Sequence, residues 1–199
     1  DSKILFYDIS KFINKEHILV SLVAGLEINT IKNCFKKNNN IIRGMPNIFC
    51  GVMKSSTAIF SSYKLNKTVK RKIDNLFNLL GANLWLNKEN EINFFTAMFG
   101  GGPAYFFYFL NVILRIAKDH GIPKKKAEKL LKNLLAGSLE FTNQNELSFS
   151  KLISLVTSKG GTTEEAIKHF EENENFFRLF SQGIEKATLK SRKINKSLN

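Results

Sequence analysis

The chain has 199 residues, of which 43% are hydrophobic, and carries a formal net charge of +13 at pH 7. This apolar content excludes an intrinsically disordered chain and suffices for one domain or two small ones. Only five of the 30 basic residues are Arg, and Lys-rich segments such as 124–139 interleave with Leu at helical spacing, so the charge indicates solvated helix faces rather than a nucleic-acid surface.

The first part of the chain alternates helix and strand patterns. In chain order these predict a helix over 3–14, strands over 17–24, 41–43, 57–60 and 83–86, and helices over 27–35 and 68–80, with a polar loop at 38–40. Because the run 17–24 is uninterrupted and apolar, it is typical of a strand covered on both faces of a parallel sheet, and 17–43 predicts a βαβ unit. The helix 68–80 should turn its apolar residues Val69, Ile73, Leu76, Phe77 and Leu80 inward and stop at an αL Gly81.

From residue 88 onward the patterns predict helices only. They cover roughly 88–98, 103–119, 124–142, 148–157, 163–172 and 175–193. The apolar stretch 104–116 is shorter than the ~20 residues that span a bilayer, so we expect a buried helix at an interface. The change of pattern near residue 88 is the best candidate for a domain boundary.

Two glycines, two threonines and two acids follow one another in Ser158–Glu165 and predict a loop entering a helix. Backbone N–H groups at such a start lack helical partners and attract a carboxylate or phosphate. A capping box, with Thr162 as cap and Glu165 three residues on, explains the same residues without a ligand. These residues alone leave both interpretations open.

Two further segments give this loop a context. In Phe99–Tyr105 three glycines precede Pro103, which suits the first turn of a long helix. Arg43-Gly44-Met45-Pro46-Asn47 closes an extended apolar run. Together, in this order and spacing, the three segments resemble the pyrroline-5-carboxylate reductase family, and the likeness extends over nearly the whole chain, from residues 20–25 to 185–193.

The resemblance implies an enzyme that reduces 1-pyrroline-5-carboxylate to L-proline with NADPH or NADH. It implies two domains: residues 1–87 as the C-terminal part of a Rossmann-type parallel-sheet NAD(P)-binding domain, and 88–199 as a 6-phosphogluconate-dehydrogenase-like helical dimerisation and substrate-binding domain. The expected partners are the imine substrate and at least one further copy of the chain, with no nucleic acid and no membrane.

By position in the family's motifs, the hydroxyl of Thr163 would contact the imine nitrogen and Ser158 would support the loop. The Gly160 segment, with the N–H groups of Gly161, Thr162 and Thr163, would hold the substrate carboxylate. Glu89 would bind the ring nitrogen or a neighbouring chain; a solvent-facing Glu is the alternative.

Seven further residues match positions near the nicotinamide half of the cofactor. They are Ala24, Gly25, Met45, Pro46, Asn47, Pro103 and Ala104. Strand-end packing is the alternative for the first five. Phe99 and Gly101 stand where the family has serines, and Ile48-Phe49 where it has Thr-Pro; the first pair removes hydroxyls near the expected active site.

The family's Gly-rich βα turn, which holds the cofactor pyrophosphate, has no counterpart in this chain. The first residue is Asp1, and a helical pattern begins almost at once after it. We therefore expect a missing N-terminal segment and no measurable NAD(P)H affinity for residues 1–199 alone. A non-catalytic assembly fragment, another imine or hydroxy-acid reductase, and a basic nucleic-acid-binding protein remain alternatives.

No other catalytic or metal-binding pattern is present in the sequence. His17, His120 and His169 lie in separate segments and are expected to be structural or on the surface. Cys34 and Cys50 show neither a zinc spacing nor a disulfide framework, which favours a reducing, cytoplasmic setting.

Overall fold

The computed structural model describes residues 2–14, 16–35 and 40–199. Its contacts group the chain into two units, the first made of residues 1–103 and 183–199 and the second of residues 104–182. The predicted domain boundary near residue 88 therefore lies inside the first unit. Most of the predicted loop 38–40 lies outside the described residues.

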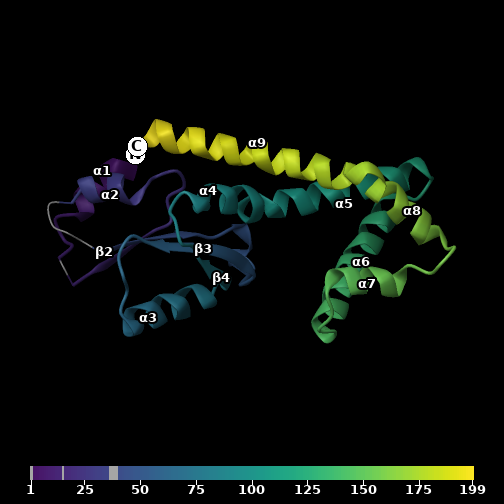
Figure 1. The fold of residues 1–199 in the computed structure, drawn as a ribbon, viewed down its shortest axis with the longest axis horizontal. Helices are drawn as coiled ribbons and strands as arrows, with labels where there is room; N and C mark the ends of the chain where they lie inside the picture. The colour runs from purple at the N-terminus through teal and green to yellow at the C-terminus, as the bar shows by residue number, and fades with distance from the viewer. Residues whose placement is uncertain (1, 15, 36–39) are drawn as a thin grey trace. The chain divides into compact units, whose positions relative to one another are not determined.

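The first unit contains a four-stranded sheet in the order β1-β2-β3-β4 (Figure 1). Its strands are β1 (Ile18–Ser21), β2 (Asn40–Met45), β3 (Ser55–Ser61) and β4 (Gly81–Trp85). The pairs β1–β2 and β3–β4 are parallel, which confirms the predicted βαβ unit, whereas β2–β3 is antiparallel. The parallel pairs of the expected Rossmann-type sheet are thus present, and β2–β3 makes the sheet a mixed one.

The antiparallel pair follows from the length of its connection. Residues 46–54, with the single short turn η1 (Ile48–Val52), link β2 to β3. A parallel crossover needs about a dozen residues or more to return to the same end of the sheet, so this connection only permits an antiparallel partner. The carboxyl end of β2 therefore passes directly into η1.

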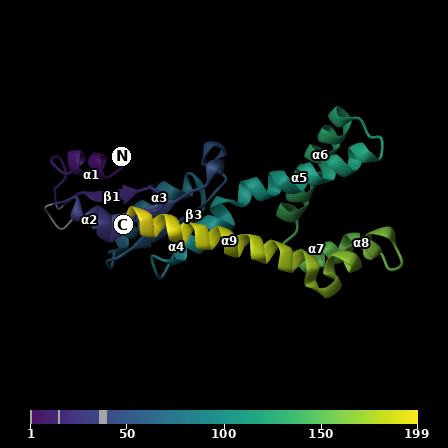
Figure 2. The same cartoon turned by 90° about the horizontal axis from the view of Figure 1, so that it is seen from above.

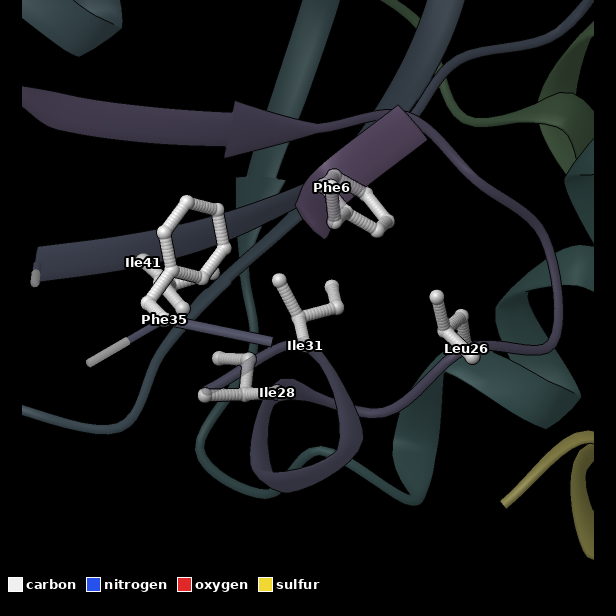
Figure 3. Packing of buried hydrophobic residues seen from close by; sticks show 6 residues of the cluster. All are labelled: Phe6, Leu26, Ile28, Ile31, Phe35 and Ile41. Carbon is white, nitrogen blue, oxygen red and sulfur yellow. The ribbon is translucent and has the colours of Figure 1, made fainter. Parts of the chain in front are cut away.

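Both faces of the sheet are covered by apolar side chains. Ile41 and Ile42 are adjacent on β2 and fully buried, and because strand side chains alternate they enter different clusters. One cluster joins β2 to α1 (Ser2–Ile9) and α2 (Ile28–Asn33); Figure 3 shows its members Phe6, Leu26, Ile28, Ile31, Phe35 and Ile41. The other joins Ile42 and Ile59 to α3 (Lys67–Asn78), on the opposite side of the sheet (Figure 1).

Helix α3 confirms most of its predicted inward face. The amide oxygen of Asn66 caps the helix by accepting from Val69 N at 2.8 Å, and Ile73 and Phe77 are buried. Leu76 is 49% exposed, so its predicted inward position was wrong. Gly81 is not an αL stop but the first residue of β4, with φ +138, and a Cβ there would collide with the Ser55 backbone.

Three helical segments complete the first unit. They are α4 (Glu91–Phe95), the π-helical turn η2 (Thr96–Gly100) and the second half of α9 (Asn175–Leu198). The hydroxyl of Ser191 on α9 donates to Asn93 Oδ1 on α4 at 2.9 Å, and Thr188 and Asn195 of α9 are buried. The C-terminal part of α9 therefore packs within the first unit.

The second unit contains α5 (Gly102–Asp119) from Ala104 onward, α6 (Lys124–Gln144), α7 (Phe149–Val156), α8 (Thr162–Glu171), η3 (Glu172–Glu174) and the beginning of α9. Its described residues include no strand, which confirms the helical prediction. Figure 2 shows α5 and α6 joined at one end as a helical hairpin.

Apolar side chains on α5 and α6 are exposed in this chain. The most exposed of them, each more than half exposed, are Phe106, Phe107, Tyr108, Phe109, Ile116, Leu130, Leu134 and Leu139. Our expectation of a buried helix at 104–116 is therefore not met within the single chain. Taken together, Glu91–Asp119 is also long and apolar enough to cross a membrane, although Gly101 separates η2 from α5 within this stretch, near the break that we expected between residues 98 and 103. By length and composition alone this is weak evidence for a membrane span.

Candidate active site

The loop before α8 ends at a cap without a side chain. Gly161 is the N-cap residue of α8, with φ −87 and ψ 166, and its N–H donates to Ser158 O at 2.9 Å. Gly160 has φ +73, a conformation that favours glycine. The two glycines thus let the chain turn sharply into the helix, as the sequence indicates.

The predicted capping box is not formed. Thr162 is the first helical residue rather than the cap, and α8 has no side-chain cap hydrogen bond. Instead Glu164, three residues after the cap, reaches back and its Oε2 accepts from Gly160 N at 2.7 Å. Of the two interpretations that the sequence leaves open, the capping box at Thr162 and Glu165 was wrong.

Two of the three backbone donors predicted for the substrate carboxylate are open. Among the described residues no acceptor lies within hydrogen-bonding reach of the N–H groups of Thr162 and Thr163, and both side chains are exposed. The N–H of Gly161 donates to Ser158 O at 2.9 Å in this conformation, and its predicted role as a donor to a ligand stays a prediction. These two donors lie at the N-terminus of a ten-residue helix, which is the positive end of its dipole.

Two acids, Glu164 and Glu165, and one basic residue, Lys168, lie close together near this helix start. The hydrogen bond from Gly160 N, and to a smaller extent Lys168, lowers the pKa of Glu164 below its ordinary value of 4.5. Lys168 Nζ lies 3.0 Å from Glu165 Oε1 and 3.5 Å from Glu164 Oε2, and these carboxylates raise its pKa, Glu165 most of all. The positive charge of Lys168 therefore offsets part of the negative charge of the two acids, which would otherwise repel an anion more strongly.

The first unit brings two predicted cofactor segments to one edge of the sheet. Ser21 on β1 is paired in parallel register with Arg43 on β2, so both strands end at the same edge. Ala24 and Gly25 follow β1 there, and Met45, Pro46 and Asn47 follow β2 or end it. Ala24 is exposed, and Met45 and Pro46 are half-buried. Ligands of α/β sheets bind beyond such carboxyl ends.

Asn47 connects the end of β2 to the helical segment before Pro103. Its Nδ2 donates to Phe99 O at 3.0 Å, and its Oδ1 accepts from Phe49 N at 3.0 Å. Pro103 has no N–H, so the Phe99 carbonyl four residues earlier lacks its ordinary helical donor. The Asn47 side chain supplies that donor and thereby fixes the glycine-rich turn against the strand end.

Glu89 is neither solvent-facing nor free. Its Oε1 accepts from Arg43 Nη1 at 2.9 Å and from Ile28 N at 2.7 Å, the first residue of α2. Arg43 is 2% exposed, so this carboxylate neutralises a buried guanidinium on β2. In this conformation Glu89 links β2, α2 and the start of α4.

The three histidines are exposed, in agreement with a surface role. His17 Nδ1 lies 2.7 Å from Asn14 Oδ1, and His120 Nδ1 lies 2.9 Å from Ile116 O. Within the described ranges no three His, Cys, Asp or Glu side chains gather as a metal site. Both cysteines are half-buried free thiols.

The predicted site residues thus fall into two sets. Ala24, Gly25, the segment Met45–Asn47, Glu89 and Pro103 lie in the first unit, while Ala104 and the loop Ser158–Thr163 lie in the second. The geometry of each set is defined within its own unit.

One family model matches a range of the chain that includes residues of both units. The family model described as pyrroline-5-carboxylate reductase dimerisation matches residues 89–194, more than half of the chain. The chain belongs to the pyrroline-5-carboxylate reductase family. The matched range begins next to the predicted boundary at residue 88 and includes the loop Ser158–Thr163.

Individual members of the pyrroline-5-carboxylate reductase family agree with this. The reductase of Staphylococcus haemolyticus is 29% identical over 189 residues, which are 95% of this chain and 69% of that protein. The solved reductase of Coxiella burnetii superposes with a TM-score of 0.89 at 27% identity, covering 96% of this chain and 71% of that one. The Plasmodium falciparum pyrroline carboxylate reductase, solved with NADP bound, gives 0.82 at 25% identity, covering 98% and 77%.

The chain spans between 57% and 69% of the length of the curated relatives that it matches. Their names state the activity of whole proteins. For this chain, the fold and the family are therefore established, and the activity is a proposal.

Two of the contacts that were not predicted from the sequence differ in how much local signal they have. The hydrogen bond that Glu164 accepts from Gly160 N has a local signal, since an acid three residues after a helix cap is a known pattern. It was missed because the cap was predicted one residue too late. The contact between Asn199 and Gly25 joins residues 174 apart and has no local signal at all.

Proposed function

We propose that this chain carries the substrate-binding portion, and the nicotinamide-facing strand ends, of an enzyme that reduces 1-pyrroline-5-carboxylate to L-proline with NADPH or NADH. The observation that carries the proposal is the pair of open N–H groups at Thr162 and Thr163, at the positive end of α8 and behind a cap without a side chain. Such a pair suits one carboxylate of a small substrate.

The proton chemistry falls to Thr163. Its hydroxyl is exposed beside the same helix start, so a carboxylate held by the two N–H groups would bring the ring nitrogen within reach of it. A hydrogen bond from this hydroxyl stabilises the nitrogen as it gains electron density. Ser158 holds the loop through its carbonyl, which accepts from Gly161 N.

The strand-end residues fit the nicotinamide half of a dinucleotide. Gly25 and the segment Met45–Asn47 lie at the carboxyl ends of two paired parallel strands, and the exposed Ala24 has no large side chain to fill the space beyond β1. Pro103 and Ala104 begin the helix that follows the glycine-rich turn. When bound, the reduced nicotinamide supplies the hydride to the C=N carbon.

For Glu89 we propose positioning in place of the direct substrate contact implied by the resemblance. Its Oε1 already neutralises Arg43 and caps α2. The free thiols of Cys34 and Cys50 suit a reducing, cytoplasmic setting, and the apolar faces of α5 and α6 suit a homodimer or a larger homo-oligomer.

An assay of the restored protein tests this proposal. The chain is extended at residue 1 by whatever segment of the Staphylococcus haemolyticus reductase precedes the match, and oxidation of NADPH is followed with 1-pyrroline-5-carboxylate. We expect turnover that yields L-proline. Thr163→Ala should lower kcat/KM for the imine by about 100-fold with little change in cofactor binding, and Thr163→Ser should recover most of it.

A restored chain that folds and binds NADPH but forms no proline would refute the proposal. It would favour the second candidate function, a non-catalytic assembly chain, which rests on the match of more than half of this chain to a dimerisation domain. That candidate predicts a stable oligomer and no turnover.

A further inference from the structure

The turn between β1 and α2 is held by residues from the far end of the chain. Asn199, which follows α9, donates from Nδ2 to Gly25 O at 2.9 Å and accepts at Oδ1 from Glu27 N at 2.9 Å. The same Nδ2 also donates to Asn195 O at 2.6 Å. One side-chain amide therefore bridges a carbonyl and an N–H of the turn, as a paired strand would.

Packing at Gly25 strengthens this connection. Gly25 has φ +80, and a Cβ placed there would lie 2.9 Å from Leu198 Cδ1 and 3.0 Å from Ile194 Cγ2. The last turn of α9 thus lies directly against the glycine backbone. A glycine is needed at this position both for its positive φ and for this close approach.

The turn has few local means of holding its shape. Helix α2 has only six residues, and its N-cap residue Glu27 makes no side-chain cap hydrogen bond. The first two N–H groups at this helix start are satisfied from elsewhere, Glu27 N by Asn199 Oδ1 and Ile28 N by Glu89 Oε1. Two distant side chains do what a local cap ordinarily does.

The end of α9 is itself anchored upstream of Asn199. Asn195 is buried, and Ser191 donates to Asn93 on α4. Asn199 lies beyond residue 194, where the match to the family model ends. The contact with Gly25 therefore involves a part of this chain that the matched family pattern does not include.

We propose that Asn199 is a positioning residue that fixes the turn 24–27 in the conformation that receives the nicotinamide half of the cofactor. This inference rests on the proposed function, since it assigns a cofactor contact to Ala24 and Gly25. Without the Asn199 bridge, the Gly25 carbonyl and the Glu27 N–H lose their protein partners, and the turn samples other conformations. Cofactor affinity then falls, because part of the binding free energy is spent on ordering the turn.

Three variants of the restored protein test this role. Asn199→Ala removes all three hydrogen bonds, whereas Asn199→Asp keeps an acceptor for Glu27 N and loses the donor to Gly25 O. The matched control is Ser197→Ala, because Ser197 is exposed on the same helical turn and, among the described residues, its hydroxyl bonds only to Ile194 O in its own helix. The readouts are the dissociation constant of NADPH by fluorescence titration, amide hydrogen exchange at Glu27 and Ile28, and the thermal midpoint.

We expect Asn199→Ala to raise the NADPH dissociation constant about fivefold to tenfold and to speed exchange at Glu27 by at least about tenfold, with Asn199→Asp intermediate. Ser197→Ala should change neither. At saturating NADPH the kcat of Asn199→Ala should return to that of the parent, which a variant that merely unfolds would not show.

An unchanged dissociation constant in Asn199→Ala would overturn the inference, even if exchange at Glu27 rises, because the clamp would then be structural only. A restored protein that binds NADPH with this dependence on Asn199 yet forms no proline would leave the inference intact and refute the proposed function. A restored protein that binds no NADPH would overturn both.

Discussion

At the scale of single residues, Glu164 shows how the loop before α8 is held. Its carboxylate accepts from Gly160 N, and this bond is the main cause of its lowered pKa. Because the folded pKa is depressed, the bond is fully present above pH 4.5 and is lost as the pH falls through the folded pKa. The loop conformation is therefore stable to mild acid and changes only below the ordinary range of a glutamate.

This gives a prediction for the pH dependence of the loop. The backbone amide resonance of Gly160, followed by NMR, should titrate with a midpoint below 4.5. Glu164→Gln keeps an acceptor oxygen but cannot titrate, so the change should disappear in that variant. Glu165→Gln is the matched control, since Glu165 contacts Lys168 and not Gly160. A midpoint at or above 4.5 in the parent would contradict the assigned hydrogen bond.

At the scale of elements, Asn47 joins β2 to the glycine-rich turn by supplying the hydrogen-bond donor that Pro103 lacks. Asn47→Ala leaves the Phe99 carbonyl without its partner and should lower the free energy of unfolding by about 1–3 kcal/mol. Pro103→Ala restores a backbone N–H four residues after Phe99. In the Asn47→Ala background it should recover about 1 kcal/mol, and in the parent it should give no such gain.

Urea unfolding of the four proteins in this cycle measures the coupling. Asn83→Ala is the control, because the side-chain amide of Asn83 bonds, within the described part of the chain, only to Oδ1 of the exposed Asn78. Strictly additive effects of the substitutions at 47 and 103 would show that Asn47 does not act through the Phe99 carbonyl.

The ion pair between Arg43 and Glu89 makes a second prediction for elements. Glu89→Ala leaves the guanidinium of Arg43 buried without a partner and removes the bond to Ile28 N, so it should destabilise the protein by about 3 kcal/mol or more. The double variant Arg43→Met with Glu89→Ala should lose clearly less, because no unpaired charge remains.

Chemical denaturation of these variants checks this order of stability. Glu91→Ala is the matched control; Glu91 is a nearby acid that bonds only to backbone N–H groups of Asn87 and Lys88. Equal losses for Glu89→Ala and the double variant would mean that the pair contributes little.

Local pattern predicted most of the elements but not how some of them meet. Period and turn residues located the strands and α-helices of the described chain, because these signals are local. Helix α1 ends earlier and α9 later than predicted, and the short turns η1 and η3 were not predicted. The antiparallel β2–β3 pair was missed although the short connection 46–54 is visible in the sequence. The capping of α2 by Glu89 and Asn199 could not be predicted, since both contacts join residues far apart.

The candidate site shows the same limit. The motif around Gly160 and Gly161 predicted a helix start with open donors, and two of the three were found. The third, Gly161 N, donates to Ser158 O in this conformation. The cap was predicted one residue too late, because only the backbone angles of Gly161 identify it.

At the scale of the whole molecule, the exposed apolar helices predict self-association. Phe106 and Tyr108 on α5 are 63% and 69% exposed, and the family model that covers this helix is a dimerisation domain. Light scattering after size exclusion should give at least twice the chain mass of 22.7 kDa. Phe106→Glu should shift the mass toward one chain, since a charge at a dehydrated interface is costly.

Ile48→Glu is the matched control, because Ile48 is 75% exposed in the other unit and should not change the mass. A monomeric parent chain, or equal effects of the two substitutions, would contradict an interface on α5.

The central claim is that the N–H groups of Thr162 and Thr163 bind the carboxylate of the substrate. Titration of the isotopically labelled chain with L-proline, observed through its backbone amide resonances, tests it most directly and needs no cofactor. We predict saturable shifts that are largest at Thr162 and Thr163, absent with pyrrolidine, which lacks the carboxylate, and unchanged by Thr163→Ala at the Thr162 amide. Saturable shifts elsewhere with none at these two amides, or equal responses to proline and pyrrolidine, would contradict the claim.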